Sequence, residues 1–164
     1  MAFVFLFIRY NFSQIMKAIV QRVKRAKVNV NKEKISEIGK GLLVFIAVGT
    51  EDDERDLEYM CDKISGLRIF EDEDFKMNKS LSDLNLELLL VSQFTLYGDV
   101  RKGKRPSFID SAKSEKGEEY YKRFIEMLKS KGIKVSCGIF GADMEVELVN
   151  DGPCTIQISS KKLY

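Results

Sequence analysis

Residues 87–99 read ELLLVSQFTLYGD, and this stretch decides which fold can form around it. It begins with the apolar run Leu88 to Val91, which is typical of a central strand buried on both faces. It then changes to polar side chains and ends at a glycine-aspartate turn signal. A buried polar atom costs about 1–3 kcal/mol unless it is bonded. The polar end of this strand therefore either bonds to neighbouring loops or meets a ligand, because ligands bind where the central strands of open α/β sheets end.

The apolar patterns on either side of this stretch predict a single α/β domain with a mixed sheet. The main elements are expected in the order β-β-β-α-β-α-β-β-β, with barrel-like sheet layers covered by two main helices. The expected strands cover residues 17–30, 34–38, 42–48, 84–97, 133–137, 144–150 and 154–160, with a short strand at 69–70. The expected helices cover residues 52–67 and 114–131.

The composition excludes several kinds of chemistry. The chain has 164 residues, 45% of them hydrophobic and 32% charged, which suits one domain with its own core. It contains no histidine, so it cannot carry a Ser-His-Asp or Cys-His site or the common histidine-based metal sites. Its three cysteines are far apart, which favours a reduced, cytoplasmic setting over a zinc site. We expect no metal and no cofactor.

Residues 1–15 are interpreted as an extension, and the domain is expected to cover residues 16–164. The apolar part of the extension is too short to span a bilayer. It also lacks the basic segment and the small-residue cleavage site of a signal peptide. Met16 is followed at once by a strand pattern, so an upstream start would explain the extension; a membrane-touching anchor is the alternative. We expect no membrane-spanning segment.

Two further segments are polar and lie close to predicted strand ends. A loop after residue 99 carries four basic side chains, which are either a solvated face or a site for a polyanion. The segment Asn150-Asp151-Gly152-Pro153 is predicted to be a hairpin turn. A turn does not explain why Pro153 stands directly next to a strand, because proline has no backbone N–H to donate to the hydrogen bonds of a sheet. If the Gly152-Pro153 bond is cis, the segment would present its carbonyl oxygens outward in fixed directions.

Residues Ser92 to Leu96 and Asn150 to Thr155 resemble the two signature motifs of D-aminoacyl-tRNA deacylases, SQFTL and NxGPxT. The resemblance covers essentially the whole chain from Met16 onward. It extends to the segments Gln21-Arg22-Val23, Gly39 to Leu42, Arg105 to Phe108, and Gly138 to Met144.

This resemblance implies a homodimer that hydrolyses the ester between a D-amino acid and the 3′-terminal adenosine of tRNA. Such an activity is chiral proofreading in translation quality control. In the family, the Gly-cis-Pro pair of one subunit enters the active site of the other, so Gly152-Pro153 would face Ser92 to Leu96 of the partner. Backbone carbonyls close to the substrate Cα accept a hydrogen but clash with an L side chain. Glycine has no Cβ, so the same site should accept glycyl-tRNA as well.

The resemblance also suggests a role for each site residue. The catalytic group would be Ser92, Gln93, Phe94 and Thr95. The backbone N–H groups near Phe94 and Thr95 would stabilise the oxyanion, and Ser92 and Gln93 would position the substrate. The terminal 2′-hydroxyl of the tRNA would assist an attacking water; Thr95 as a covalent nucleophile is the alternative, although it lacks an adjacent base.

The remaining residues would support the site or bind the tRNA. Leu96, Asn150 and Thr155 complete the two motifs. Phe140 and Met144 would pack against the terminal adenine, or are ordinary core residues. Arg101, Lys102, Lys104 and Arg105 would meet acceptor-stem phosphates. Two rival functions stay open, namely a non-catalytic RNA-binding module and a hydrolase of small esters.

Overall fold

The computed structural model describes residues 15–163, so the expected extension lies outside the described residues except for Ile15. The strands are β1 (Lys17–Val30), β2 (Glu33–Ile38), β3 (Gly41–Ala47), β4 (Phe70–Glu71), β5 (Met77–Lys79), β6 (Glu87–Ser92), β7 (Lys134–Cys137) and β8 (Glu145–Ser159). The helices are α1 (Glu54–Ser65), α2 (Leu81–Leu84), the 3-10 helix η1 (Phe94–Tyr97) and α3 (Ser114–Ser130).

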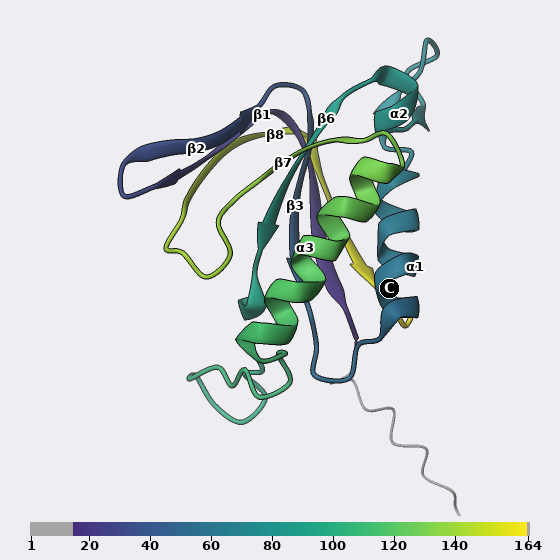
Figure 1. Cartoon of the computed structure of the whole chain (residues 1–164). Coiled ribbons are helices and arrows are strands. Elements are labelled where there is room, and N and C mark those ends of the chain that lie inside the picture. Colours follow the sequence, from purple (N-terminus) through teal and green to yellow (C-terminus); the bar gives the residue numbers. More distant parts are fainter. Residues whose placement is uncertain (1–14, 164) are drawn as a thin grey trace, which may run out of the picture.

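The main sheet is mixed, as predicted. Its strand order is β2-β1-β3-β6-β7, and β8 pairs with β1 outside this path. The strand β1 is antiparallel to β2, β3 and β8, whereas β6 is parallel to both β3 and β7. Figure 1 shows the sheet strongly curled, with α1 and α3 on one face. The predicted single α/β domain with two main helices is confirmed.

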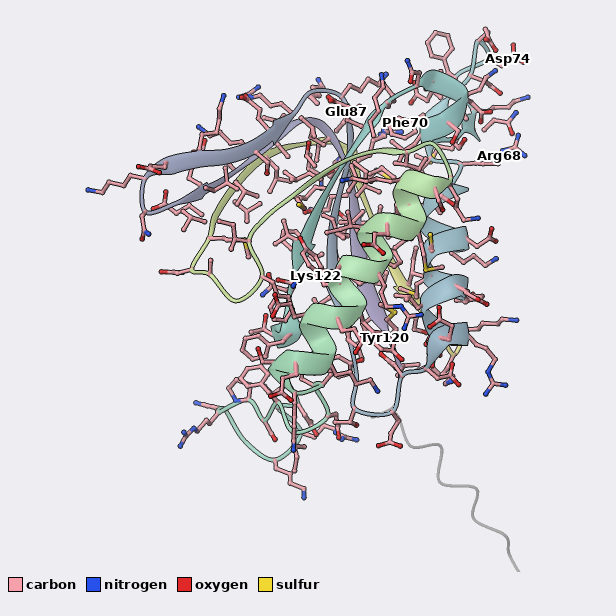
Figure 2. All side chains as sticks on the ribbon, in the orientation of Figure 1. Arg68, Phe70, Asp74, Glu87, Tyr120 and Lys122 are labelled. Atoms are coloured by element: carbon pink, nitrogen blue, oxygen red, sulfur yellow. The ribbon has the colours of Figure 1, made fainter. Side chains whose placement is uncertain are left out.

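The two central strands are buried on both faces, which explains their continuous apolar sequences. On β6, Leu88 and Leu90 face the core beneath the helices. The alternate residues Leu89 and Val91 face a second core inside the curl of the sheet. Side chains fill the space between the sheet and the helices (Figure 2). This packing fixes the place where β6 ends, and so fixes the position of Ser92.

The expected strand over residues 84–97 is too long. The ladder of β6 ends at Ser92, after which the Gln93 amide donates to the Ile46 carbonyl at 2.8 Å. The chain then turns into η1, in which the Leu96 amide donates to the Gln93 carbonyl at 3.2 Å. The signature residues after Ser92 are therefore in a tight helical turn instead of an extended strand.

The predicted hairpin turn at Asn150–Pro153 is wrong. The two expected final strands are a single strand, β8, whose two halves both pair with β1. Val23 pairs with Asn150 and Gln21 pairs with Thr155, so the intervening residues of β8 bulge out opposite Arg22. A hairpin would pair the two halves with each other, but β1 is long enough to pair with both.

The short strand expected at residues 69–70 is found as β4, one residue further along, whereas the short elements β5 and α2 were not predicted. The β4–β5 pair lies at the opposite end of the molecule from the basic loop, near Arg68 and Asp74 in Figure 2. The described part of the chain contains no helix that is both long and apolar enough to cross a membrane.

Candidate active site

A pocket of about 570 Å³ opens where β6 ends. Three segments of the chain meet there: the end of β6 with the start of η1, the segment that leads into α3, and the segment between β7 and β8. The lining residues include Ser92, Gln93, Phe94, Phe108, Ser111, Ser114, Phe140, Asp143 and Met144. Five predicted site residues are thus brought together, because Ser92, Gln93, Phe94, Phe140 and Met144 all line one pocket.

The side chains of the first motif are held by local contacts. The Gln93 side-chain amide donates to the Thr95 hydroxyl at 2.5 Å. The Phe94 ring is 57% exposed and packs edge-on against Phe108, with 5.2 Å between the ring centroids. Exposing an apolar ring to water is unfavourable, and a ligand that covers the ring removes this unfavourable contact. The Phe94 ring at the edge of the pocket is therefore available to a ligand. Thr95 is exposed and does not line the pocket.

The backbone at the start of η1 offers two hydrogen-bond donors. Within the described residues, the amides of Phe94 and Thr95 donate to no acceptor, because the first donated bond in η1 belongs to Leu96. The first amides of any helical turn lack a partner inside the turn. Here they lie directly after Gln93, whose side chain lines the pocket.

Phe140 and Met144 belong both to the pocket and to the core. The Phe140 ring lies 5.8 Å from the Tyr121 ring, and its edge packs closely on Gly117 of α3. The Met144 sulfur packs so closely on Gly138 that a Cβ at Gly138 would lie 2.5 Å from it. Their core contacts orient these two side chains, and their remaining surfaces line the cavity.

The pocket contains little that could serve as a general base. Asp143 is the one titratable side chain among the described lining residues, and it is exposed. Tyr121, just beneath, donates its hydroxyl to the Leu90 carbonyl at 2.8 Å. Burial also raises the pKa of Tyr121. Within the described residues, the pocket therefore offers backbone donors, hydroxyl groups and the Asp143 carboxylate.

The second motif forms a fixed loop outside this pocket. The Asn150 side chain donates to the Thr155 hydroxyl at 3.0 Å and accepts from the Cys154 amide at 3.0 Å. The Gly152–Pro153 peptide bond is cis, and both residues are exposed. Neither residue lines the pocket of its own chain. Asn150 and Thr155 therefore shape the loop, and the structure does not bring it to Ser92–Phe94 of the same chain.

Sequence reasoning missed Arg22, which anchors this loop. Arg22 is only 6% exposed, and its Nη1 donates to the Ile69 carbonyl at 2.6 Å. Its Nε donates to the Asp151 carbonyl at 3.2 Å and lies 3.6 Å from the Asp151 carboxylate. Arg22 stands between Gln21 and Val23 and is followed by Lys24 and Arg25, so no local pattern distinguishes it, and its partners lie far along the chain. The sequence reasoning also assigned no role to Phe108 or to the serines at 111 and 114.

The basic loop lies next to η1 and is closed at its neck by two backbone bonds between Asp99 and Ser107. Arg101 forms an ion pair with Asp99 at 2.7 Å, and the hydrogen bonds from Arg101 hold the pKa of Asp99 well below its usual range. Lys102, Lys104 and Arg105 are exposed and form no ion pair within the described residues. The free positive charge of the loop therefore comes from these three side chains.

No group of three or more histidine, cysteine, aspartate or glutamate side chains is arranged to hold a metal ion within residues 15–163.

The chain resembles known proteins over nearly its whole length. The sequence profile of the D-Tyr-tRNA(Tyr) deacylase family matches residues 19–159. The D-aminoacyl-tRNA deacylase of Thermotoga petrophila is 58% identical over 149 residues, which are 91% of this chain and 100% of that protein. The corresponding protein of Caldicellulosiruptor saccharolyticus is 54% identical over 149 residues, again 91% of this chain and 100% of the relative.

Two solved structures share the fold. One, described as c-Myc DNA Unwinding Element Binding Protein, has a TM-score of 0.82 and 45% identity, and the match covers 87% of this chain and 97% of that one. The other, described as a probable eukaryotic D-amino acid tRNA deacylase, has a TM-score of 0.76 and covers 88% of this chain and 99% of that one. At 19% identity it supports the fold alone. The family profile and the close relatives together show that this chain belongs to the D-Tyr-tRNA(Tyr) deacylase family.

Proposed function

We propose that this protein hydrolyses the ester bond of D-aminoacyl-tRNA and releases a free D-amino acid and tRNA in the cytoplasm. The observation that carries this proposal is the pocket at the end of β6, where Ser92, Gln93 and Phe94 meet Phe140 and Met144. The close relatives are named for the same activity. The Phe140 ring and the Met144 thioether offer an apolar surface of the kind on which a terminal adenine stacks.

The arrangement favours attack by water over a covalent intermediate. The free amides of Phe94 and Thr95 would stabilise the negative charge that develops on the ester oxygen. The Thr95 hydroxyl accepts from Gln93, and no described lining residue besides Asp143 could accept its proton. A hydroxyl nucleophile needs an adjacent base. The 2′-hydroxyl of the terminal ribose, which the substrate brings with it, would orient the attacking water.

We further propose that the active unit is a homodimer. Gly152 and Pro153 are exposed and lie outside the pocket of their own chain, so they can restrict a substrate only in the pocket of a second copy. There their carbonyl groups would leave room for a hydrogen on the substrate Cα and exclude an L side chain. The same geometry admits glycine, so glycyl-tRNA would be a substrate too. The exposed side chains of Lys102, Lys104 and Arg105 would contact acceptor-stem phosphates.

The decisive experiment compares matched tRNA charged with the D- or the L-form of one amino acid, with glycyl-tRNA alongside. We expect release of the D-amino acid and of glycine, and little release of the L-amino acid. Equal release from the D- and L-forms would contradict the proposal. Binding of tRNA without release would identify a non-catalytic nucleic-acid-binding module. Hydrolysis of a D-amino acid ester that lacks tRNA, at a similar rate, would identify a small-ester hydrolase.

A complementation experiment tests the shared site. One variant, Gln93→Ala, alters the pocket, and the other, Gly152→Val, alters the loop. Each homodimer should lose activity, whereas a mixed dimer contains one site with an unaltered pocket and an unaltered loop. Recovery of activity on mixing supports the shared site. Absence of recovery in a mixture shown to exchange subunits contradicts it.

The role of the ribose is tested with tRNA that ends in 2′-deoxyadenosine. We expect a rate at least about 100-fold lower, which corresponds to the loss of one well-placed acid-base group. An unchanged rate would exclude assistance by the 2′-hydroxyl.

A further inference from the structure

Asp52 has a buried carboxylate in which one oxygen accepts a hydrogen bond and the other does not. It is 3% exposed. Its Oδ2 accepts a hydrogen bond from the Gly49 amide at 2.6 Å, but its Oδ1 is buried and has no hydrogen-bond partner among the described residues. A buried charge of this kind is costly unless a positive group lies beside it.

Three lysines face Asp52, and each is engaged elsewhere. Lys17 donates to the Leu96 carbonyl at 3.4 Å. Lys161 lies 3.0 Å from the carboxylate of Asp56. Lys116 donates to the Thr50 carbonyl at 2.7 Å. Asp56 itself adds a second negative charge nearby. Burial raises the pKa of Asp52 to about 6, so the three lysines do not compensate its charge in the chain as it stands.

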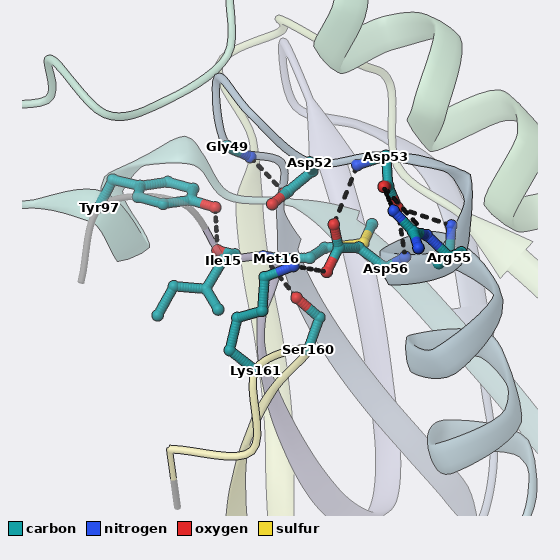
Figure 3. A network of polar contacts seen from close by, with 10 residues as sticks. All are labelled: Ile15, Met16, Gly49, Asp52, Asp53, Arg55, Asp56, Tyr97, Ser160 and Lys161. Carbon is teal, nitrogen blue, oxygen red and sulfur yellow. Dashed lines mark hydrogen bonds and ion pairs between the residues drawn. The ribbon is translucent and has the colours of Figure 1, made fainter. Parts of the chain in front are cut away.

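The beginning of β1 lies next to this carboxylate (Figure 3). Met16 is fully buried, and its backbone amide donates to the Ser160 hydroxyl at 3.1 Å. The Tyr97 hydroxyl donates to the carbonyl of Ile15. A Cβ placed on Gly49 would lie 2.6 Å from the Tyr97 hydroxyl and 3.3 Å from Asp52 Oδ1, so both oxygens border the same small space. The Ser160 and Tyr97 hydroxyls thus bond the two sides of the peptide between Ile15 and Met16, and Asp52 Oδ1 borders the same small space as the Tyr97 hydroxyl.

We propose that Asp52, Ser160 and Tyr97 form a binding site for the α-ammonium group of Met16, in a polypeptide that begins at Met16. A peptide nitrogen has one hydrogen to donate, and here it goes to Ser160. An ammonium group has three. The two additional hydrogens would bond to Asp52 Oδ1 and to the Tyr97 hydroxyl as acceptor, and the positive charge would compensate the buried carboxylate. Met16 is a methionine, so translation can start there.

A chain that begins at Met16 contains every helix and strand of the described residues. The first element, β1, starts at Lys17, and every other element follows it. The Thermotoga petrophila relative is matched by 149 residues over its full length. A chain of this length therefore suffices for a stable protein of this family.

The test compares two purified proteins, one with residues 1–164 and one that begins at Met16, each with and without Asp52→Asn. In the protein that begins at Met16, Asp52→Asn removes the partner of the ammonium group, and we expect the melting temperature to fall by at least about 2–4 °C, the shift typical of one lost interaction in a chain of this length. In the longer protein the same change removes an uncompensated charge, so the melting temperature should stay constant or rise. Equal shifts in the two proteins would overturn the proposal.

Asp83→Asn is the matched control. Asp83 completes the capping box of α2 with Ser80, and α2 lies at the opposite end of the molecule from the start of β1 (Figure 1). Its replacement should lower the melting temperature of both proteins equally.

A second measurement needs no variant. The pKa of the Met16 α-amino group, followed by NMR or by its rate of acylation across a pH series, should lie above the ordinary value of about 7.7–8.0. An increase of one pKa unit would make acylation at neutral pH about tenfold slower than in an unstructured peptide with the same first residues. An ordinary or lowered pKa would overturn the proposal, even if the variants fail to fold.

Discussion

Arg22 Nε donates a hydrogen bond of 3.2 Å to the carbonyl oxygen of Asp151, and so joins the first strand of the sheet to the loop that carries Gly152 and Pro153. The same guanidinium donates to the Ile69 carbonyl at 2.6 Å. A lysine has the charge but not the planar set of donors needed to reach both carbonyls.

Arg22→Lys should lower the free energy of unfolding by about 1–3 kcal/mol, because a buried carbonyl loses its partner. It should also reduce the preference for D- over L-aminoacyl-tRNA, since the loop is no longer held. Urea unfolding and the deacylation assay measure the two effects separately. Arg25→Lys, an exposed position on the same strand, is the control and should change neither quantity. Lower stability with unchanged preference would show that Arg22 does not set the direction of the loop.

Thr95→Ala should retain most of the deacylation activity, with a loss smaller than about 100-fold. The Thr95 hydroxyl accepts a hydrogen bond from Gln93, and its removal disturbs the position of that side chain but not the backbone donors. Single-turnover kinetics with D-aminoacyl-tRNA measure the effect, and Thr95→Ser serves as the control that keeps the hydroxyl. Detection of an acyl group on Thr95 by mass spectrometry would show that Thr95 is the nucleophile after all.

Lys104→Glu and Arg105→Glu should weaken tRNA binding without changing which amino acid is removed. Each lost phosphate contact should reduce the slope of log K against log salt by about 0.7–0.9. Lys129→Glu, in the last turn of α3, provides a control with the same change of charge far from the loop. Arg101→Glu is less informative, because Asp99 already pairs with Arg101. Equal weakening by Lys129→Glu would mean that net charge alone governs binding.

The stability of the 164-residue chain should fall as the pH rises from about 4 to 6. The pKa of Asp52 is raised from 3.8 to about 6 by burial, so the folded protein holds this proton more tightly than the unfolded chain does. Below about pH 4, Asp52 is protonated in both the folded and the unfolded chain, and the free energy of unfolding is not reduced. Above about pH 6, Asp52 is ionised in both, and the free energy of unfolding is lower by about 3 kcal/mol. Denaturant unfolding across this range measures the effect, and Asp52→Asn should flatten the curve. An unchanged curve in the variant would exclude Asp52 as its cause.

The sequence predicted the parts of the fold that depend on local periodicity. The apolar run of β6 predicted a strand buried on both faces, and the pattern of residues 52–67 predicted the helix that is found as α1. The helical turn at Phe94–Tyr97 was missed because four residues are too few to show a helical period. The continuity of β8 was missed because it depends on pairing with β1, more than a hundred residues away.

The site shows the same division. The first motif identified Ser92 to Phe94, which line the pocket, and the similarity of the segment Gly138 to Met144 led to Phe140 and Met144. No local pattern could reveal that Arg22 fixes the second motif, because its partners come from two distant segments. Phe108 belongs to the segment Arg105 to Phe108, which resembles the deacylase family, but its sequence predicted no role for the ring that packs against Phe94.

The pairing of β1 with β8 also bears on how this protein is made. The first strand of the described fold is bonded along most of its length to the last one, from Lys17 with Ser159 to Asn29 with Glu145. During synthesis on the ribosome, the edge of β1 that pairs with β8 therefore stays without its native partner until almost the entire chain has been made. Contacts so distant in sequence make folding slow, and an unpaired strand edge exposes the nascent chain to aggregation. The loop with Gly152 and Pro153 lies within that last strand, so the part of the molecule proposed to select the substrate is among the last to be put in place.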